Sequence, residues 1–178
     1  MLRYIIIVPK YFTIFLFILC TASLAPTARA ETIKIVALGA SNTVGRAGTT
    51  YPAELETMLK AKGYDAQVVN AGRDGDTTAG MLSRLDAAVP NGTRLVLLNP
   101  ANLNDAKAGI RDQQDEYVAR ITSRLNARNI KIIVLPSFTS IGVQHIPGDD
   151  EHFGADGYRA VAAWVLPQVI AAIGSPGK

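Results

Sequence analysis

Residues 33–43 read IKIVALGASNT, an apolar run that ends in a loop of small residues. The apolar part, Ile33 to Leu38, is rich in β-branched residues and is typical of a strand buried on both faces. The loop that follows places the hydroxyl of Ser41 at the carboxyl end of that strand. In open α/β sheets, ligands bind outside this end of the strands, and small residues let the backbone approach them closely. Ser41 is therefore the leading candidate for a nucleophile.

The rest of the chain alternates strand and helix patterns. Apolar runs with β-branched residues also occur at residues 66–69, 95–98 and 130–135. Four helical patterns lie between or after these runs: around Leu55 to Leu59, at residues 77–89, around Val118 to Leu125, and at residues 155–173. In the last of them, Pro167 is expected to kink or interrupt the helix. This alternation predicts an α/β fold, in which a mostly parallel sheet of four to five strands has helices on both faces. The optional fifth strand lies near residues 143–146.

Residues 1–30 differ in composition from the rest of the chain. They contain three basic residues and no acidic residue, and their apolar stretch at residues 11–20 is followed by Ala28-Arg29-Ala30. This pattern predicts a secretory signal peptide that is cleaved after export. A retained membrane anchor is the alternative, but the uninterrupted apolar part is well below the roughly 20 residues that a spanning helix needs. Lipidation at Cys20 is a further alternative, disfavoured because Leu19 rather than a small residue precedes it.

The remaining residues, 31–178, have the length of one ordinary domain. The whole chain has 18 Lys and Arg residues against 15 Asp and Glu residues, and the leader holds the three extra positive charges. A neutral domain argues against a nucleic-acid partner. The only cysteine, Cys20, is in the leader, so residues 31–178 are expected to have neither a disulfide nor cysteine chemistry. We expect an exported protein, periplasmic or secreted, without stable membrane insertion once the leader is cleaved.

Polar residues and glycine follow the second and third predicted strands as well. Gly72, after the second, offers a backbone N–H that a ligand can approach, and Asn104, beyond the third, offers a side-chain amide. In a parallel sheet these loops open at the same edge as Ser41. During acyl transfer, the N–H groups of Ser41 and Gly72 and the amide of Asn104 fit the role of oxyanion donors.

A serine nucleophile needs a base, normally a histidine held by a carboxylate. Of the two histidines, His152 lies three residues after Asp149, a spacing that lets a tight turn direct both side chains into one crevice. We therefore expect His152 to be the base and Asp149 its orienting carboxylate, and we expect His145 to be structural or to lie on the surface. Two histidines near scattered carboxylates do not form a metal ligand set, and no cofactor is expected.

Four segments, in this order, resemble the four sequence blocks of the SGNH hydrolases, the GDSL-like esterases and lipases. They are Gly39-Ala40-Ser41, Asn70-Ala71-Gly72 with Gly75-Asp76-Thr77, Asn104-Asp105, and Asp149-Asp150-Glu151-His152. The resemblance implies a flavodoxin-like three-layer α/β/α sandwich that hydrolyses esters through an acyl-serine intermediate. By position, it implies Ser41 as nucleophile and oxyanion donor, Gly72 and Asn104 as further donors, and His152 with Asp149 as base and partner.

Two positions depart from the family pattern. Ala40 stands where the family usually has Asp, and Asn102 stands where its third block usually begins with Gly. A family member that binds glycans or lipids without turnover is therefore an alternative. A flavin or phosphate binder is another, but five residues separate Gly39 from Gly45 and Arg46 follows, so the loop does not match a Walker loop. The predicted function is hydrolysis of small acyl esters of the acetylated-glycan, lysophospholipid or aryl type.

Overall fold

The computed structural model describes residues 31–46 and 48–176, and the predicted leader lies outside them. Its centre is a four-stranded parallel sheet with the strand order β2-β1-β3-β4. Each of the four predicted apolar runs forms one of these strands, which confirms the predicted parallel sheet. The strands are β1 (Ile33–Gly39), β2 (Ala66–Gly72), β3 (Thr93–Leu98) and β4 (Lys131–Val134).

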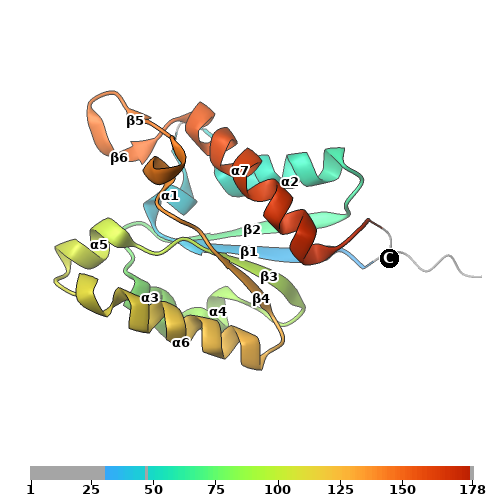
Figure 1. Cartoon of the computed structure of the whole chain (residues 1–178), viewed down its shortest axis with the longest axis horizontal. Helices are drawn as coiled ribbons and strands as arrows, with labels where there is room; N and C mark the ends of the chain where they lie inside the picture. The colour runs from blue at the N-terminus through green and yellow to red at the C-terminus, as the bar shows by residue number, and fades with distance from the viewer. Residues whose placement is uncertain (1–30, 47, 177–178) are drawn as a thin grey trace, which may run out of the picture.

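Helices cover both faces of the sheet and form the expected three-layer sandwich (Figure 1). On one face lie α2 (Tyr51–Ala61) and α7 (Ala155–Ile173). On the other face lie α3 (Thr78–Ser83), α4 (Leu85–Ala88) and α6 (Gln114–Ala127). Shorter helical turns connect these elements, namely α1 (Ser41–Val44), α5 (Asn102–Lys107), η1 (Arg111–Gln113) and η2 (Phe138–Ile141).

Strand β1 lies between β2 and β3 and is buried on both faces. Because side chains alternate along a strand, Ile35 and Ala37 pack into the core under α2 and α7, whereas Val36 and Leu38 pack into the core under α3 and α6. All four side chains are fully buried. Burial on both sides explains why this stretch reads as one continuous apolar run rather than as an alternating pattern.

Two helices begin and end close to the predicted positions. The hydroxyl of Thr50 accepts a hydrogen bond from the N–H of Ala53 at 3.1 Å, so α2 begins with a side-chain cap and has Pro52 in its first turn. Helix α7 covers residues 155–173, as predicted, and runs through Pro167 without interruption.

Two details differ from the expectations. The predicted helix at residues 77–89 is divided into α3 and α4 at Arg84, whose backbone leaves the helical region. The segment near residues 143–146 does not add a strand to the parallel sheet. Instead, β5 (His145–Ile146) pairs antiparallel with β6 (Asp149–Phe153) in a separate two-stranded hairpin, because the two strands are joined by a tight turn with Gly148 at φ 82°.

The carboxyl ends of the parallel strands form one edge of the molecule. Helices α1 and α5 and the β5–β6 hairpin gather at this edge (Figure 1). The segments that carry Ser41, Asn104 and His152 therefore meet there, although they are far apart in the sequence. Within residues 31–46 and 48–176, the structure contains no helix that is long and apolar enough to cross a membrane.

Candidate active site

Ser41 is the first residue of α1, directly beyond the end of β1. The N–H groups of Thr43 and Val44 donate to the carbonyl oxygen of Ala40 at 2.9 and 3.1 Å, so the chain turns sharply after the strand. Gly39 permits this turn, because a Cβ atom at that position would lie 2.1 Å from the hydroxyl of Thr43. The result is a half-buried serine held on a short turn at the edge of the sheet.

His152 and Asp149 both lie on β6 and contact each other directly. His152 Nδ1 is 2.8 Å from Asp149 Oδ2 and 3.1 Å from Oδ1. Asp149 Oδ1 also accepts the backbone N–H groups of Glu151 and His152, at 2.9 and 3.0 Å. The hydrogen bond from Glu151, together with the contact to His152, lowers the pKa of the Asp149 carboxyl group. A charged carboxylate at Nδ1 keeps the proton on that nitrogen and leaves Nε2 as the proton acceptor.

Ser41 and His152 line the same cavity, whose volume is about 540 Å³. No hydrogen bond joins the Ser41 hydroxyl to the imidazole among the described residues, and such contacts are often long before substrate binds. The two loops are nevertheless tied together, because Asn42 Nδ2 donates to the carbonyl oxygen of Glu151 at 3.0 Å. One hydrogen bond thus connects the neighbour of Ser41 to the neighbour of His152.

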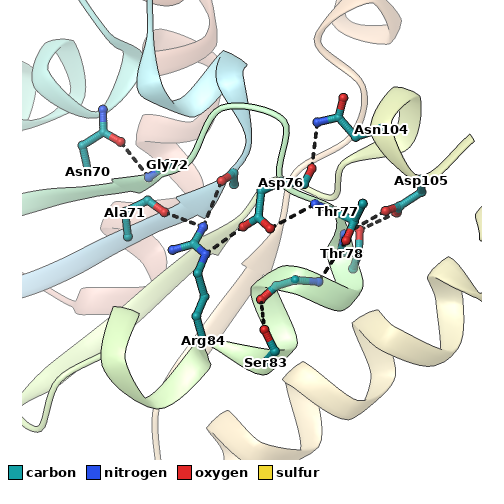
Figure 2. Close-up of polar contacts among 12 residues, drawn as sticks. Asn70, Ala71, Gly72, Asp76, Thr77, Thr78, Ser83, Arg84, Asn104 and Asp105 are labelled. Atoms are coloured by element: carbon teal, nitrogen blue, oxygen red, sulfur yellow. Dashed lines mark hydrogen bonds and ion pairs between the residues drawn. The ribbon is translucent and has the colours of Figure 1, made fainter. Parts of the chain in front are cut away.

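Asn104, on α5, lines the same cavity. Its Nδ2 donates to the carbonyl oxygen of Asp76 at 2.7 Å, which orients the amide and leaves its second N–H free (Figure 2). The adjacent Asp105 is fully buried and accepts the N–H and the hydroxyl of Thr78, at 2.8 and 2.6 Å, and the amide of Gln114, at 2.6 Å. Asp105 therefore fixes α5 against α3 and the start of α6.

Arg84 joins three segments beneath the site (Figure 2). Its Nη2 donates to the carbonyl oxygens of Gly39 and Ala71, at 3.2 and 2.9 Å, at the ends of β1 and β2. Its Nε donates to Asp76 Oδ2 at 2.7 Å. Arg84 could not be predicted from the sequence, because an arginine within a predicted helix gives no signal that its side chain bridges two strand ends.

Gly72 does not take the predicted place of an oxyanion donor in this structure. Its N–H donates to Asn70 Oδ1 at 2.9 Å, and it lines neither cavity of the site. A Cβ atom at Gly72 would lie 2.4 Å from the backbone nitrogen of Val44, so the glycine permits close packing of β2 against α1. Gly75 lines the cavity with Ser41 instead, and its N–H makes no hydrogen bond to another described residue.

A second, smaller cavity of about 240 Å³ shares Ser41, Asn104 and Glu151 with the first. His145 lines this second cavity and packs edge-on against Phe153, with ring centroids 4.6 Å apart. Within the described part of the chain, no group of three or more His, Cys, Asp or Glu side chains is arranged to hold a metal ion. The chemistry that this arrangement can support is acyl transfer to a serine, because a histidine held by a carboxylate and a side-chain amide line the same cavity as Ser41.

The chain is similar to known proteins in both sequence and fold. Residues 37–174 match the model of the GDSL-like Lipase/Acylhydrolase family. The esterase TesA of Pseudomonas aeruginosa is 30% identical over 114 residues, which cover 63% of this chain and 57% of TesA. The chain thus spans less than two thirds of the length of that relative.

Solved structures of the same fold include AlinE4, an SGNH-hydrolase family esterase, and TesA. AlinE4 is 26% identical with a TM-score of 0.54, and the match covers 84% of this chain and 76% of AlinE4. The crystal structure of TesA is 22% identical with a TM-score of 0.66, and the match covers 78% of this chain and 99% of that chain. The fold predicted from the sequence is therefore confirmed.

Proposed function

Because this chain belongs to the GDSL-like lipase and acylhydrolase family, we propose that it hydrolyses carboxylic ester bonds through an acyl-serine intermediate. The single observation that carries the proposal is the shared cavity: Ser41, His152 and Asn104 line it together. The contact between His152 Nδ1 and Asp149 supplies the orientation that a histidine base needs.

In the first half of the proposed reaction, Ser41 Oγ attacks the ester carbonyl carbon while His152 Nε2 takes the hydroxyl proton. Asp149 holds the imidazole and stabilises the imidazolium that forms. The carbon–oxygen bond to the alcohol then breaks, and His152 gives its proton to the leaving oxygen. In the second half, water attacks the acyl-serine while His152 Nε2 takes a proton from it. The bond between the acyl carbon and Ser41 Oγ then breaks, His152 returns the proton to Oγ, and the carboxylic acid leaves.

The tetrahedral intermediates carry a negative oxygen that needs preorganised donors. We assign this role to the N–H of Ser41 and the free N–H of Asn104, as expected from the sequence. Gly75 replaces Gly72 as the backbone donor, because its N–H is uncommitted and it lines the cavity. Substitution of Gly75 is constrained by its backbone, which has φ 69°.

We also propose that the protein acts after export, as the composition of residues 1–30 suggests. Its substrates are small acyl esters. Expression with the full leader, followed by mass spectrometry of the periplasmic and extracellular fractions, tests the export. A chain that begins at residue 31 supports the proposal, and a membrane-bound chain with an intact leader contradicts it.

Labelling with a fluorophosphonate tests the esterase directly, because this reagent forms an adduct only with an activated serine. Intact-mass analysis should show one adduct on the wild-type protein and none on Ser41→Ala. Hydrolysis of 4-nitrophenyl acetate should fall by on the order of a thousandfold or more in Ser41→Ala and His152→Ala. A folded wild-type protein that neither reacts nor turns over ester is instead a binding protein with a family fold.

A further inference from the structure

The smaller cavity beside Ser41 is lined by neutral polar and apolar side chains together. Four asparagines contribute to its wall, together with hydroxyl groups and an imidazole. The polar members are Asn42, Asn99, Asn102, Asn104, Ser137, Thr139 and His145. Side chains of this kind bind groups that both donate and accept hydrogen bonds.

Several of these polar groups are uncommitted. The side chains of Asn99 and Asn102 make no hydrogen bond to any other described residue. The amides of Asn99 and Asn102 are therefore free to hydrogen-bond a polar ligand.

The charge of the cavity excludes anionic ligands. Among the residues that the structure describes, no Lys or Arg side chain lines it, whereas Asp150 and Glu151 do. Arg46 and Lys107 line the larger cavity and are already paired with Asp74 and Glu151. A phosphate-bearing group, such as the headgroup of a lysophospholipid, therefore meets carboxylates rather than cations here.

The size of the cavity matches one ring. Its volume is about 240 Å³. A cavity of about 150 Å³ holds benzene, so this one holds a six-membered ring with substituents but not a long acyl chain. A methylene chain would also cover the free amides of Asn99 and Asn102 without replacing their hydrogen bonds to water. Leu103, Phe138 and Phe153 supply an apolar wall that the C–H face of a sugar contacts.

We propose that this cavity binds the hydroxyl-bearing ring of an O-acylated sugar, so that the enzyme removes short acyl groups from carbohydrates in preference to long acyl groups from lipids. The proposal rests on the ester hydrolysis proposed above. The ester lies where the two cavities meet, at Ser41 and Asn104. Asp150 and Glu151, which precede His152 on β6, border the sugar cavity.

Kinetics on three esters tests this preference. We expect kcat/KM for acetylated xylotriose to exceed that for 4-nitrophenyl palmitate and for lysophosphatidylcholine by at least about tenfold. Asn99→Leu and Asn102→Leu should lower kcat/KM for acetylated xylotriose about tenfold more than for 4-nitrophenyl acetate, mainly through KM. Asn126→Leu, an exposed asparagine on α6, is the matched control and should leave both values unchanged. A preference for either lipid, or equal losses on both acetyl esters, overturns the proposal.

Calorimetry separates this proposal from the proposed activity. Ser41→Ala should bind acetylated xylotriose, and adding Asn102→Leu should weaken that binding about tenfold. If the wild-type protein hydrolyses 4-nitrophenyl acetate but Ser41→Ala shows no sugar binding at millimolar concentration, the sugar cavity is refuted while the esterase stands. If the sugar binds but no ester is hydrolysed, the esterase is refuted while the cavity stands.

Discussion

The two sides of the candidate site are held in place by different means. The side that carries Asn104 rests on buried polar groups, since Asp105 is fully buried and the Asp76 and Arg84 side chains are 7% and 20% exposed (Figure 2). The side that carries His152 lies on a two-stranded hairpin, whose Lys107–Glu151 ion pair is 55% and 45% exposed.

We therefore expect the two sides to differ in how much they contribute to the free energy of unfolding. Buried, hydrogen-bonded charges are strongly destabilising when one partner is removed, whereas exposed ion pairs contribute about 0–1 kcal/mol. We therefore expect the side that carries Asn104, called the donor side, to be rigid before substrate binds. The side that carries His152, called the base side, packs Phe153 into the core but is otherwise held by exposed contacts.

The largest expected effect comes from Asp149→Asn on the base side. The asparagine oxygen still accepts the N–H groups of Glu151 and His152, but its amide faces Nδ1 and disfavours the tautomer that leaves Nε2 free. We expect kcat to fall by about 10² to 10⁴. The measurement is hydrolysis of 4-nitrophenyl acetate, with Asp115→Asn, an exposed aspartate on α6, as the control. A loss in kcat of less than about threefold contradicts the role of Asp149.

Asp149→Asn also tests how the free energy of unfolding depends on pH. The pKa of Asp149 is lowered in the folded protein, so its charge stabilises the fold above the ordinary aspartate pKa of about 3.9. This stabilisation is lost as the pH falls through the lowered pKa of Asp149 in the folded protein. Urea unfolding from pH 3 to 8 should show wild type and Asp149→Asn converging below about pH 4. If the two free energies of unfolding instead move apart at acid pH, the pKa of Asp149 is not lowered in the folded protein.

The next largest effect is on stability, from Asp105→Ala on the donor side. The substitution leaves the N–H and hydroxyl of Thr78 and the amide of Gln114 without their acceptor. We expect the free energy of unfolding to fall by roughly 3 kcal/mol or more, because each unsatisfied buried donor costs about 1 kcal/mol or more. Asp112→Ala, an exposed aspartate in η1, is the control for urea denaturation. Equal stability of the two variants would show that the buried network does not hold the donor side.

A smaller effect is expected from Arg84→Met. The methionine fills part of the space but cannot bind the carbonyl oxygens of Gly39 and Ala71 or the carboxylate of Asp76. The segments that carry Ser41 and Asn104 should lose their fixed spacing, so kcat should fall by about ten- to a hundredfold with a smaller change in KM. Arg120→Met on the exposed face of α6 is the control. If KM rises while kcat is unchanged, Arg84 does not position the reacting groups.

The smallest expected effect is from Lys107→Met, which removes the exposed ion pair with Glu151. The free energy of unfolding should change by less than about 1 kcal/mol, and the effect should shrink further in high salt. Activity should fall by less than about fivefold, since Asn42 still binds the backbone of Glu151. Unfolding and turnover measured at low and high salt check this. A loss as large as that of Arg84→Met would show that the hairpin is held by its charges.

Local patterns were sufficient for most of the fold. The apolar runs predicted all four parallel strands, and the apolar periodicity of residues 155–173 predicted α7. The contact between Asp149 and His152 was also expected from the sequence, because a tight turn can bring two residues three positions apart together. Such features depend on neighbours in the chain.

Contacts between distant segments were not predicted. Arg84 binds groups at residues 39 and 71, and nothing in its own helix indicates that. Gly72 and Gly75 are three residues apart and equally permissive, so only the position of α1 shows that one is packed and the other faces the cavity. The β5–β6 hairpin stands apart from the parallel sheet, a pairing that two short strands do not reveal.

The sequence by itself determined the strand run that begins at Ile33, the serine just beyond its end and the order of the polar segments that follow. The physical reason is that burial on both faces and tight turns are local requirements, written in consecutive residues. Only the tertiary structure decided which N–H groups are free, which asparagines line the cavity beside Ser41, and which side chains hold them. Those outcomes depend on hydrogen bonds and packing between segments that the sequence separates.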